Sequence, residues 1–177
     1  DQFVGTWHME SVQSGKSPIS IDLQIGSPEK NILYPAEMRI QCDSFSGTYH
    51  LLLVKRNIRQ LAIGRNKIAS SETPFSIGNW TVPLNGIFDF SRDNKGNAFL
   101  SAERMYAKHY GVDMPDLNRI PAPYKTTATR IRDFMAESEI TLKRNDPAPW
   151  VSAYADSILI PGLSKDYYGI IDPISVK

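Results

Sequence analysis

Alternation of apolar and polar residues dominates the first hundred positions of the chain. The clearest run is residues 19–25, where aliphatic side chains alternate with Ser20, Asp22 and Gln24. Because successive side chains of a strand point to opposite faces, this run predicts a half-buried strand. Similar patterns predict further strands at residues 6–13, 37–42, 48–55, 60–65, 75–80, 86–91 and 98–105.

Short polar segments separate these candidate strands. Residues 55–59 form one such turn, and residues 92–97 form another that contains Asn94 and Gly96. Asn and Gly tolerate positive φ angles, which makes the second segment a strong hairpin signal. Many short strands at regular spacing are typical of a β-sandwich or a β-barrel.

The pattern changes after the last of these strands. Residues 111–125 contain three prolines and are predicted to be a loop, whereas residues 126–135 carry their apolar side chains on one side and predict a helix. Residues 139–144 return to the strand period. We therefore expect a barrel domain over residues 1–144, followed at 145–177 by a proline-punctuated arm packed on the barrel or a linker toward a further domain.

The opening segment Phe3-Val4-Gly5-Thr6-Trp7 resembles the first-strand signature of the calycins, the group that contains lipocalins and fatty-acid-binding proteins. Glycine lets the chain enter the strand tightly, and the tryptophan plugs the closed end of the barrel. The resemblance implies an all-β fold, an antiparallel up-and-down barrel of about eight or nine strands with one helix before the last strand. It also implies that Lys143 or Arg144 lies across the Trp7 indole as a cation–π partner.

The same resemblance leads us to expect a non-catalytic protein that holds a small, largely apolar ligand inside the barrel. Strand faces select the residues of this candidate site. The expected lining is Trp7, Met9, Tyr49, Leu51, Phe88 and Phe90. If the ligand has an anionic end, we expect that end to meet Arg65 or Arg104. The basic residues around the hairpin at 55–67 would favour such a ligand if that hairpin rims the barrel mouth.

Two other functions remain open at this point. One is an accessory module of a larger cell-surface protein, with a filled barrel and an exposed surface that recognises a glycan or another protein. The other is a hydrolase at the barrel mouth, which needs a close pair such as His50 with an acid. His8 and His50 both lie on predicted strands and could meet inside the barrel.

Composition narrows the classes of partner. The chain has 20 basic and 19 acidic residues and a net charge of +1, which provides no field for attracting nucleic acid. No apolar run reaches the length of a membrane-spanning helix. The sequence shows no catalytic motif, metal-ligand spacing or cofactor-binding turn, so we expect no enzyme and no cofactor.

The location of the protein is inferred from the resemblance, which favours a secreted or cell-envelope protein. A signal segment would then have preceded Asp1 and been removed. The single cysteine, Cys42, permits no disulfide within the chain. Taken alone this favours a reducing compartment, although many exported bacterial proteins also lack disulfides.

Overall fold

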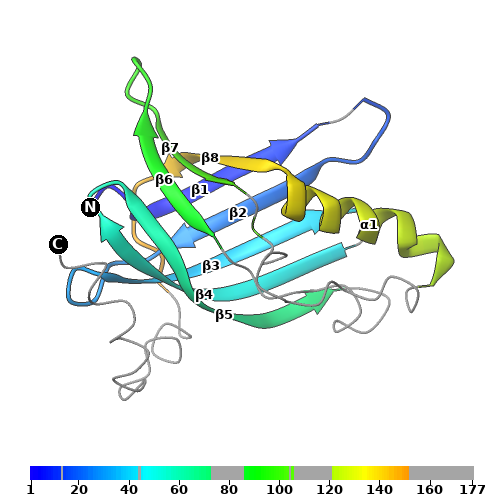
Figure 1. The fold of residues 1–177 in the computed structure, drawn as a ribbon, viewed down its shortest axis with the longest axis horizontal. Helices are drawn as coiled ribbons and strands as arrows, with labels where there is room; N and C mark the ends of the chain where they lie inside the picture. The colour runs from blue at the N-terminus through cyan, green and yellow to red at the C-terminus, as the bar shows by residue number, and fades with distance from the viewer. Residues whose placement is uncertain (13, 44, 73–85, 104, 106–120, 152–177) are drawn as a thin grey trace.

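The computed structural model describes residues 1–12, 14–43, 45–72, 86–103, 105 and 121–151. These residues form a closed antiparallel barrel in which each strand pairs with the next and the last pairs with the first (Figure 1). The strands are β1 (Gly5–Ser11), β2 (Ile19–Ile25), β3 (Leu33–Cys42), β4 (Phe45–Asn57), β5 (Gln60–Glu72), β6 (Ile87–Arg92), β7 (Ala98–Glu103) and β8 (Glu139–Asp146). The one helix among the described residues, α1 (Ala122–Glu137), precedes β8. The predicted all-β up-and-down barrel with one helix is confirmed.

The two ends of the barrel carry different connections. An up-and-down chain places successive connections alternately at one end and at the other. We call the end where the N-terminal residues 1–4 and the β4–β5 hairpin lie the tryptophan end, since Trp7 is buried there. The opposite end carries the β1–β2 and β3–β4 connections and α1, and we call it the helix end. Figure 1 shows the N-terminus and α1 on opposite sides of the barrel.

The interior of the barrel is filled from alternate strand positions. Trp7 pairs with Leu23, Leu23 with Met38 and Met38 with Tyr49, so four neighbouring strands contribute one row of inward side chains. Each of these side chains is at most 1% exposed. Burial of one large apolar side chain is worth about 1.5–3 kcal/mol, so rows of this kind supply the main stabilisation of the barrel.

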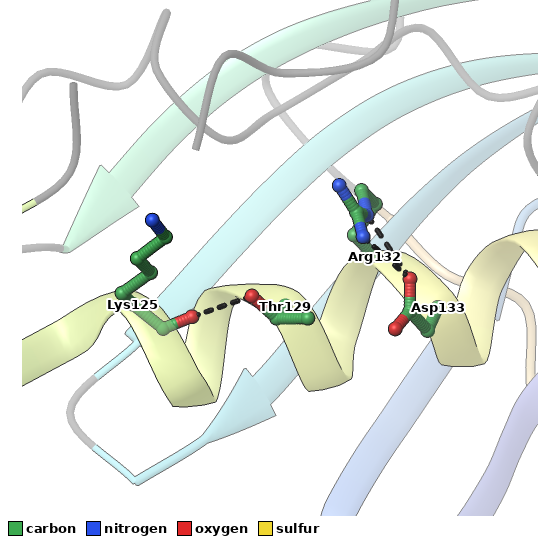
Figure 2. A network of polar contacts seen from close by, with 4 residues as sticks. All are labelled: Lys125, Thr129, Arg132 and Asp133. Carbon is green, nitrogen blue, oxygen red and sulfur yellow. Dashed lines mark hydrogen bonds and ion pairs between the residues drawn. The ribbon is translucent and has the colours of Figure 1, made fainter. Parts of the chain in front are cut away.

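Helix α1 closes part of the helix end with its apolar face. Ala128, Ile131 and Met135 are buried and belong to the same interior cluster as the strand residues. Some polar residues of the helix contact one another locally (Figure 2). The Thr129 hydroxyl donates to the Lys125 carbonyl at 2.7 Å, and Arg132 is paired with Asp133 at 2.9 Å.

Three contacts fix α1 to the strand connections. The Arg130 guanidinium donates to the Ser17 carbonyl at 2.8 Å, in the β1–β2 connection. The Thr127 hydroxyl donates to the Asp43 carboxylate at 3.1 Å, at the β3–β4 turn. The backbone N–H of Met105 donates to the carbonyl of Met135 at 2.8 Å, near the end of the helix. These bonds hold the helix against the β1–β2 and β3–β4 connections and against Met105, which follows β7 closely in the chain.

The observed elements differ from the predicted bounds at several places. The helix begins at Ala122, so residues 122–125 are helical and not part of the predicted loop. The reason is that Pro123 lies in the first turn, where a backbone N–H has no partner within the helix and proline costs little. β4 and β5 are both longer than predicted, and the predicted strand at residues 75–80 lies outside the described residues.

A second, smaller cluster covers part of the outer face of β3 and β4. Leu33, Leu52 and Val54 are buried there, and Trp150 packs against them. The backbone N–H of Trp150 donates to the Ile25 carbonyl at 3.2 Å. The chain that follows β8 thus returns along the barrel wall and shields apolar side chains that face away from the interior.

Candidate functional site: the barrel interior

The tryptophan end is packed by aromatic rings. Trp7 is fully buried, and its indole N–H donates to the carbonyl of Phe3 at 3.0 Å. The Phe90 ring lies edge-on to Trp7 at 6.3 Å between centroids and edge-on to Phe3 at 6.0 Å. Edge-to-face contacts of this kind are favourable arrangements of aromatic quadrupoles. The Trp7 N–H is thus satisfied by a backbone carbonyl, while the rings of Phe3, Trp7 and Phe90 pack against one another at this end.

The basic residue expected across the Trp7 indole is Arg144, not Lys143. Arg144 is paired with Trp7 in the β1–β8 register, and its guanidinium carbon lies 5.4 Å from the indole centroid. The guanidinium also donates to the carbonyl of Gln2 at 3.1 Å. Burial, with a smaller contribution from Arg92, lowers the pKa of Arg144. Arg144 thus joins the N-terminal segment to the last strand.

Glycine at position 5 is required by this junction. Gly5 has a φ of +134°, and a Cβ atom there would lie 2.2 Å from the carbonyl oxygen of Asp146. L-residues rarely adopt such a φ angle, and no side-chain atom fits so close to a backbone oxygen. The glycine of the opening motif therefore allows β1 and β8 to close the barrel.

The hydroxyl of Tyr34 is a second buried polar group at this end that has a hydrogen-bond partner. Its hydroxyl donates to the Asp1 carboxylate at 2.6 Å, and the other oxygen of that carboxylate accepts the backbone N–H of Phe3 at 2.9 Å. Burial raises the pKa of Tyr34 to about 12. The hydroxyl therefore stays protonated and acts as a donor over the ordinary pH range.

Tyr49 differs from the aromatic groups of the tryptophan end. It lies in β4, paired with Met38, and its side chain is 1% exposed within the interior cluster. Among the residues that the structure describes, its hydroxyl has no hydrogen-bond partner. Burial raises the pKa of Tyr49, so the buried group is a neutral O–H donor. We take the interior around this hydroxyl as the candidate site.

The predicted lining residues can be placed against this interior. Five of them are buried members of the interior cluster, and the sixth, Met9, is partly buried and packs against it. The five are Trp7, Tyr49, Leu51, Phe88 and Phe90. Of the two predicted cations, Arg65 lies in β5 with only its backbone described, and Arg104 lies outside the described residues.

The basic hairpin lies at the tryptophan end. Its tip is held by the side-chain amide of Gln2, which donates to the Ile58 carbonyl. Lys55 and Arg56 are half-buried there and Arg59 is exposed. Aromatic rings contact one another in the interior at this same end.

The two histidines on strands, which could have met inside the barrel, do not do so; each lies beside a carboxylate on a neighbouring strand. The His8 Nδ1 atom lies 2.7 Å from the Asp22 carboxylate, and the His50 Nε2 atom lies 3.3 Å from the Glu37 carboxylate. All four side chains alternate with inward-facing neighbours, so each pair lies on the outer face. His50 thus has an acid within reach, but the pair faces away from the interior.

The sequence did not single out the residues of α1 or Cys42 as parts of the interior. The buried thiol of Cys42 lies 3.7 Å from a guanidinium nitrogen of Arg130, and burial raises its pKa. Ile131 and Met135 reach the same cluster from the helix. The one-sided apolar pattern of the helix was the available signal, but it does not say which surface the helix covers.

Neither metal-ligand groups nor the helix among the described residues, nor likeness to other proteins, adds an assignment. Within the described parts of the chain, no group of three or more His, Cys, Asp or Glu residues is placed to hold a metal ion. The one described helix lacks the length and apolar character needed to cross a membrane. The sequence matches no protein-family model, and comparisons with curated proteins and with solved structures give no match.

Proposed function

We propose that this protein is a non-catalytic binding protein that holds a small, largely apolar molecule in the barrel interior. The observation that supports this function best is the buried hydroxyl of Tyr49, which lies in a largely apolar interior cluster and has no partner among the described residues. Buried polar groups in proteins nearly always have a hydrogen-bond partner, and an unsatisfied one costs about 1–3 kcal/mol. A bound molecule would supply the missing partner.

The shape of the barrel also supports binding. An eight-stranded barrel is just wide enough for side chains to fill it or for one small ligand to occupy it. The described strand residues contribute three small side chains to the interior cluster, Ala36 on β3 and Ala98 and Ala102 on β7. Small side chains at inward positions leave more of the interior for a ligand than leucine or phenylalanine would.

Native mass spectrometry tests this proposal directly. Freshly purified protein is measured under native conditions, and the same sample is measured again after denaturation. We expect a discrete extra mass that is lost on denaturation, because an interior ligand is released only when the barrel opens. If the mass is that of the bare chain, and incubation with a panel of fatty acids and sterols adds nothing, interior binding is refuted.

Two variants of β4 separate interior binding from adhesion to the surface. Leu51→Trp adds volume inside the barrel, whereas Thr48→Trp adds the same side chain at a half-buried outward position. We expect Leu51→Trp to lose the extra mass and Thr48→Trp to keep it, with circular dichroism confirming that both are folded. If folded Leu51→Trp keeps the ligand, the ligand sits outside the barrel, and a surface-recognition module becomes the better description.

A further inference from the structure

We infer that Tyr49 is the polar anchor of the interior site, and that the ligand is a neutral molecule whose hydrogen-bond acceptor, such as a carbonyl or ether oxygen, receives the tyrosine O–H. This inference rests on the proposed function and specifies the chemical class of the ligand. It follows from a comparison of the polar groups that the described interior contains.

Four side chains of the interior cluster carry a group capable of hydrogen bonding, and three of them are partnered. The Trp7 indole donates to Phe3, the Tyr34 hydroxyl donates to Asp1, and the Cys42 thiol lies beside Arg130. Only the Tyr49 hydroxyl lacks a described partner, although it is 1% exposed. The unmet hydrogen bond is therefore localised at one atom, on the inward face of β4.

The chemistry of that atom specifies what the ligand must offer. A phenol buried in apolar surroundings remains protonated, so its hydroxyl donates one hydrogen bond most readily. A ligand oxygen or nitrogen with a free lone pair accepts that bond. A pure hydrocarbon would fill the same space but would leave the hydroxyl unsatisfied, which carries a substantial penalty.

The charges around the interior favour a neutral ligand. Among the described residues, the only buried polar or charged side chains outside the cluster are Ser46 and His50, both on the outer face of β4. Arg144 lies at the tryptophan end, and Arg130 already donates to a backbone carbonyl at the helix end. An ion placed beside Tyr49 would lose its water without gaining a described counter-ion, which is strongly unfavourable.

Three naphthalenes of similar size test this inference. They are 2-acetylnaphthalene, which is neutral with a carbonyl acceptor, 2-isopropylnaphthalene, which is a hydrocarbon, and 2-naphthoate, which is an anion. Affinities are measured by ligand fluorescence titration for the wild type, Tyr49→Phe and the control Tyr34→Phe. We expect the wild type to bind the ketone and the hydrocarbon and to bind the anion much more weakly.

The decisive quantity is the affinity of the ketone divided by that of the hydrocarbon. We expect Tyr49→Phe to lower this ratio about fivefold to tenfold, which is the value of one neutral hydrogen bond. Tyr34→Phe should leave the ratio unchanged, because the Tyr34 hydroxyl is already bonded to Asp1. The Tm of ligand-free Tyr49→Phe should equal or exceed that of the wild type.

The possible failures are distinguishable. If the wild type binds these compounds but Tyr49→Phe leaves the ratio unchanged, the anchor is wrong and interior binding stands. If 2-naphthoate binds as tightly as the ketone, the neutral class is wrong. A clear fall in the Tm of ligand-free Tyr49→Phe means that the hydroxyl has a partner in the protein, which overturns the inference. If none of the three binds and the native protein carries no extra mass, the proposed function fails as well.

Discussion

Two tyrosines on adjacent strands show how the two parts of the barrel interior differ. Tyr34 in β3 and Tyr49 in β4 are both almost fully buried, and burial raises the pKa of each. The Tyr34 hydroxyl is bonded to Asp1 at the tryptophan end, whereas the Tyr49 hydroxyl has no partner among the described residues. The first hydroxyl ties the N-terminal residue to β3, and the second remains a buried donor that the proposed ligand would engage.

The same contrast extends to the surrounding contacts. At the tryptophan end, the Arg144 guanidinium and the Trp7 indole both bond to carbonyls of the N-terminal segment. The Arg144–Gln2 bond joins residues 142 positions apart and ties the last strand to the N-terminal segment, whereas the Trp7–Phe3 bond spans four positions and holds that segment against β1. Tyr49 belongs to the interior cluster, and no polar contact of its side chain is described. Mutations at the two regions should therefore affect stability and binding differently.

The largest effect is expected at Gly5. In Gly5→Ala, a φ of +134° and a Cβ atom 2.2 Å from the Asp146 carbonyl oxygen force β1 and β8 apart. Backbone strain and overpacking together should lower the free energy of unfolding by about 2–6 kcal/mol, measured by urea denaturation. The control Gly15→Ala has positive φ but nothing within 4 Å, and should lose only about 1–2 kcal/mol. Equal losses for the two variants would show that the close approach of β1 and β8 is unimportant.

A smaller effect separates the two tyrosines. Tyr34→Phe removes a bond to a carboxylate and should lower the free energy of unfolding by about 1–3 kcal/mol, whereas Tyr49→Phe should change it by less than about 0.5 kcal/mol or increase it. Both substitutions delete one oxygen from a buried ring, so each is the control for the other. Thermal and urea unfolding of the ligand-free proteins give the comparison. If both variants lose the same stability, the contrast between the two hydroxyls does not exist.

The smallest expected effect is a change in alkaline stability. Burial raises the pKa of folded Tyr34 from 10.0 to about 12, so the folded state holds this proton more tightly than the unfolded state. Its contribution is fully present below pH 10 and is lost as the pH rises through about 12. The free energy of unfolding should therefore fall with pH less steeply in Tyr34→Phe than in the wild type across this window. Identical slopes would contradict the raised pKa.

Much of the barrel followed from local patterns in the sequence. Period-two alternation identified the eight described strands, apart from some of their bounds, and placed Tyr49 and Leu51 on one face, because a strand allows only two directions for a side chain. The Asn94 and Gly96 signal matched the β6–β7 hairpin, where Gly96 has a φ of +82°. The helix was found, but its start was missed because a proline in the first turn resembles a loop signal.

The polar contacts that define the site could not be read in the same way. The bond between Tyr34 and Asp1 joins residues 33 positions apart, and no periodicity connects them. The assignment of Arg144 rather than Lys143 required the β1–β8 register, which places Arg144 opposite Trp7. Local spacing shows which face a residue occupies, but it does not show which distant atom lies within bonding distance.

The sequence by itself therefore determined the strand faces, the hairpin and the glycine–tryptophan opening, because these depend on backbone geometry over a few neighbouring residues. Only the tertiary structure decided that His8 and His50 pair with separate acids on the outer face, that α1 covers the helix end, and that Tyr49 alone among the interior polar groups has no described partner. These features depend on register and closure, which bring atoms from distant strands together only when the whole barrel has formed.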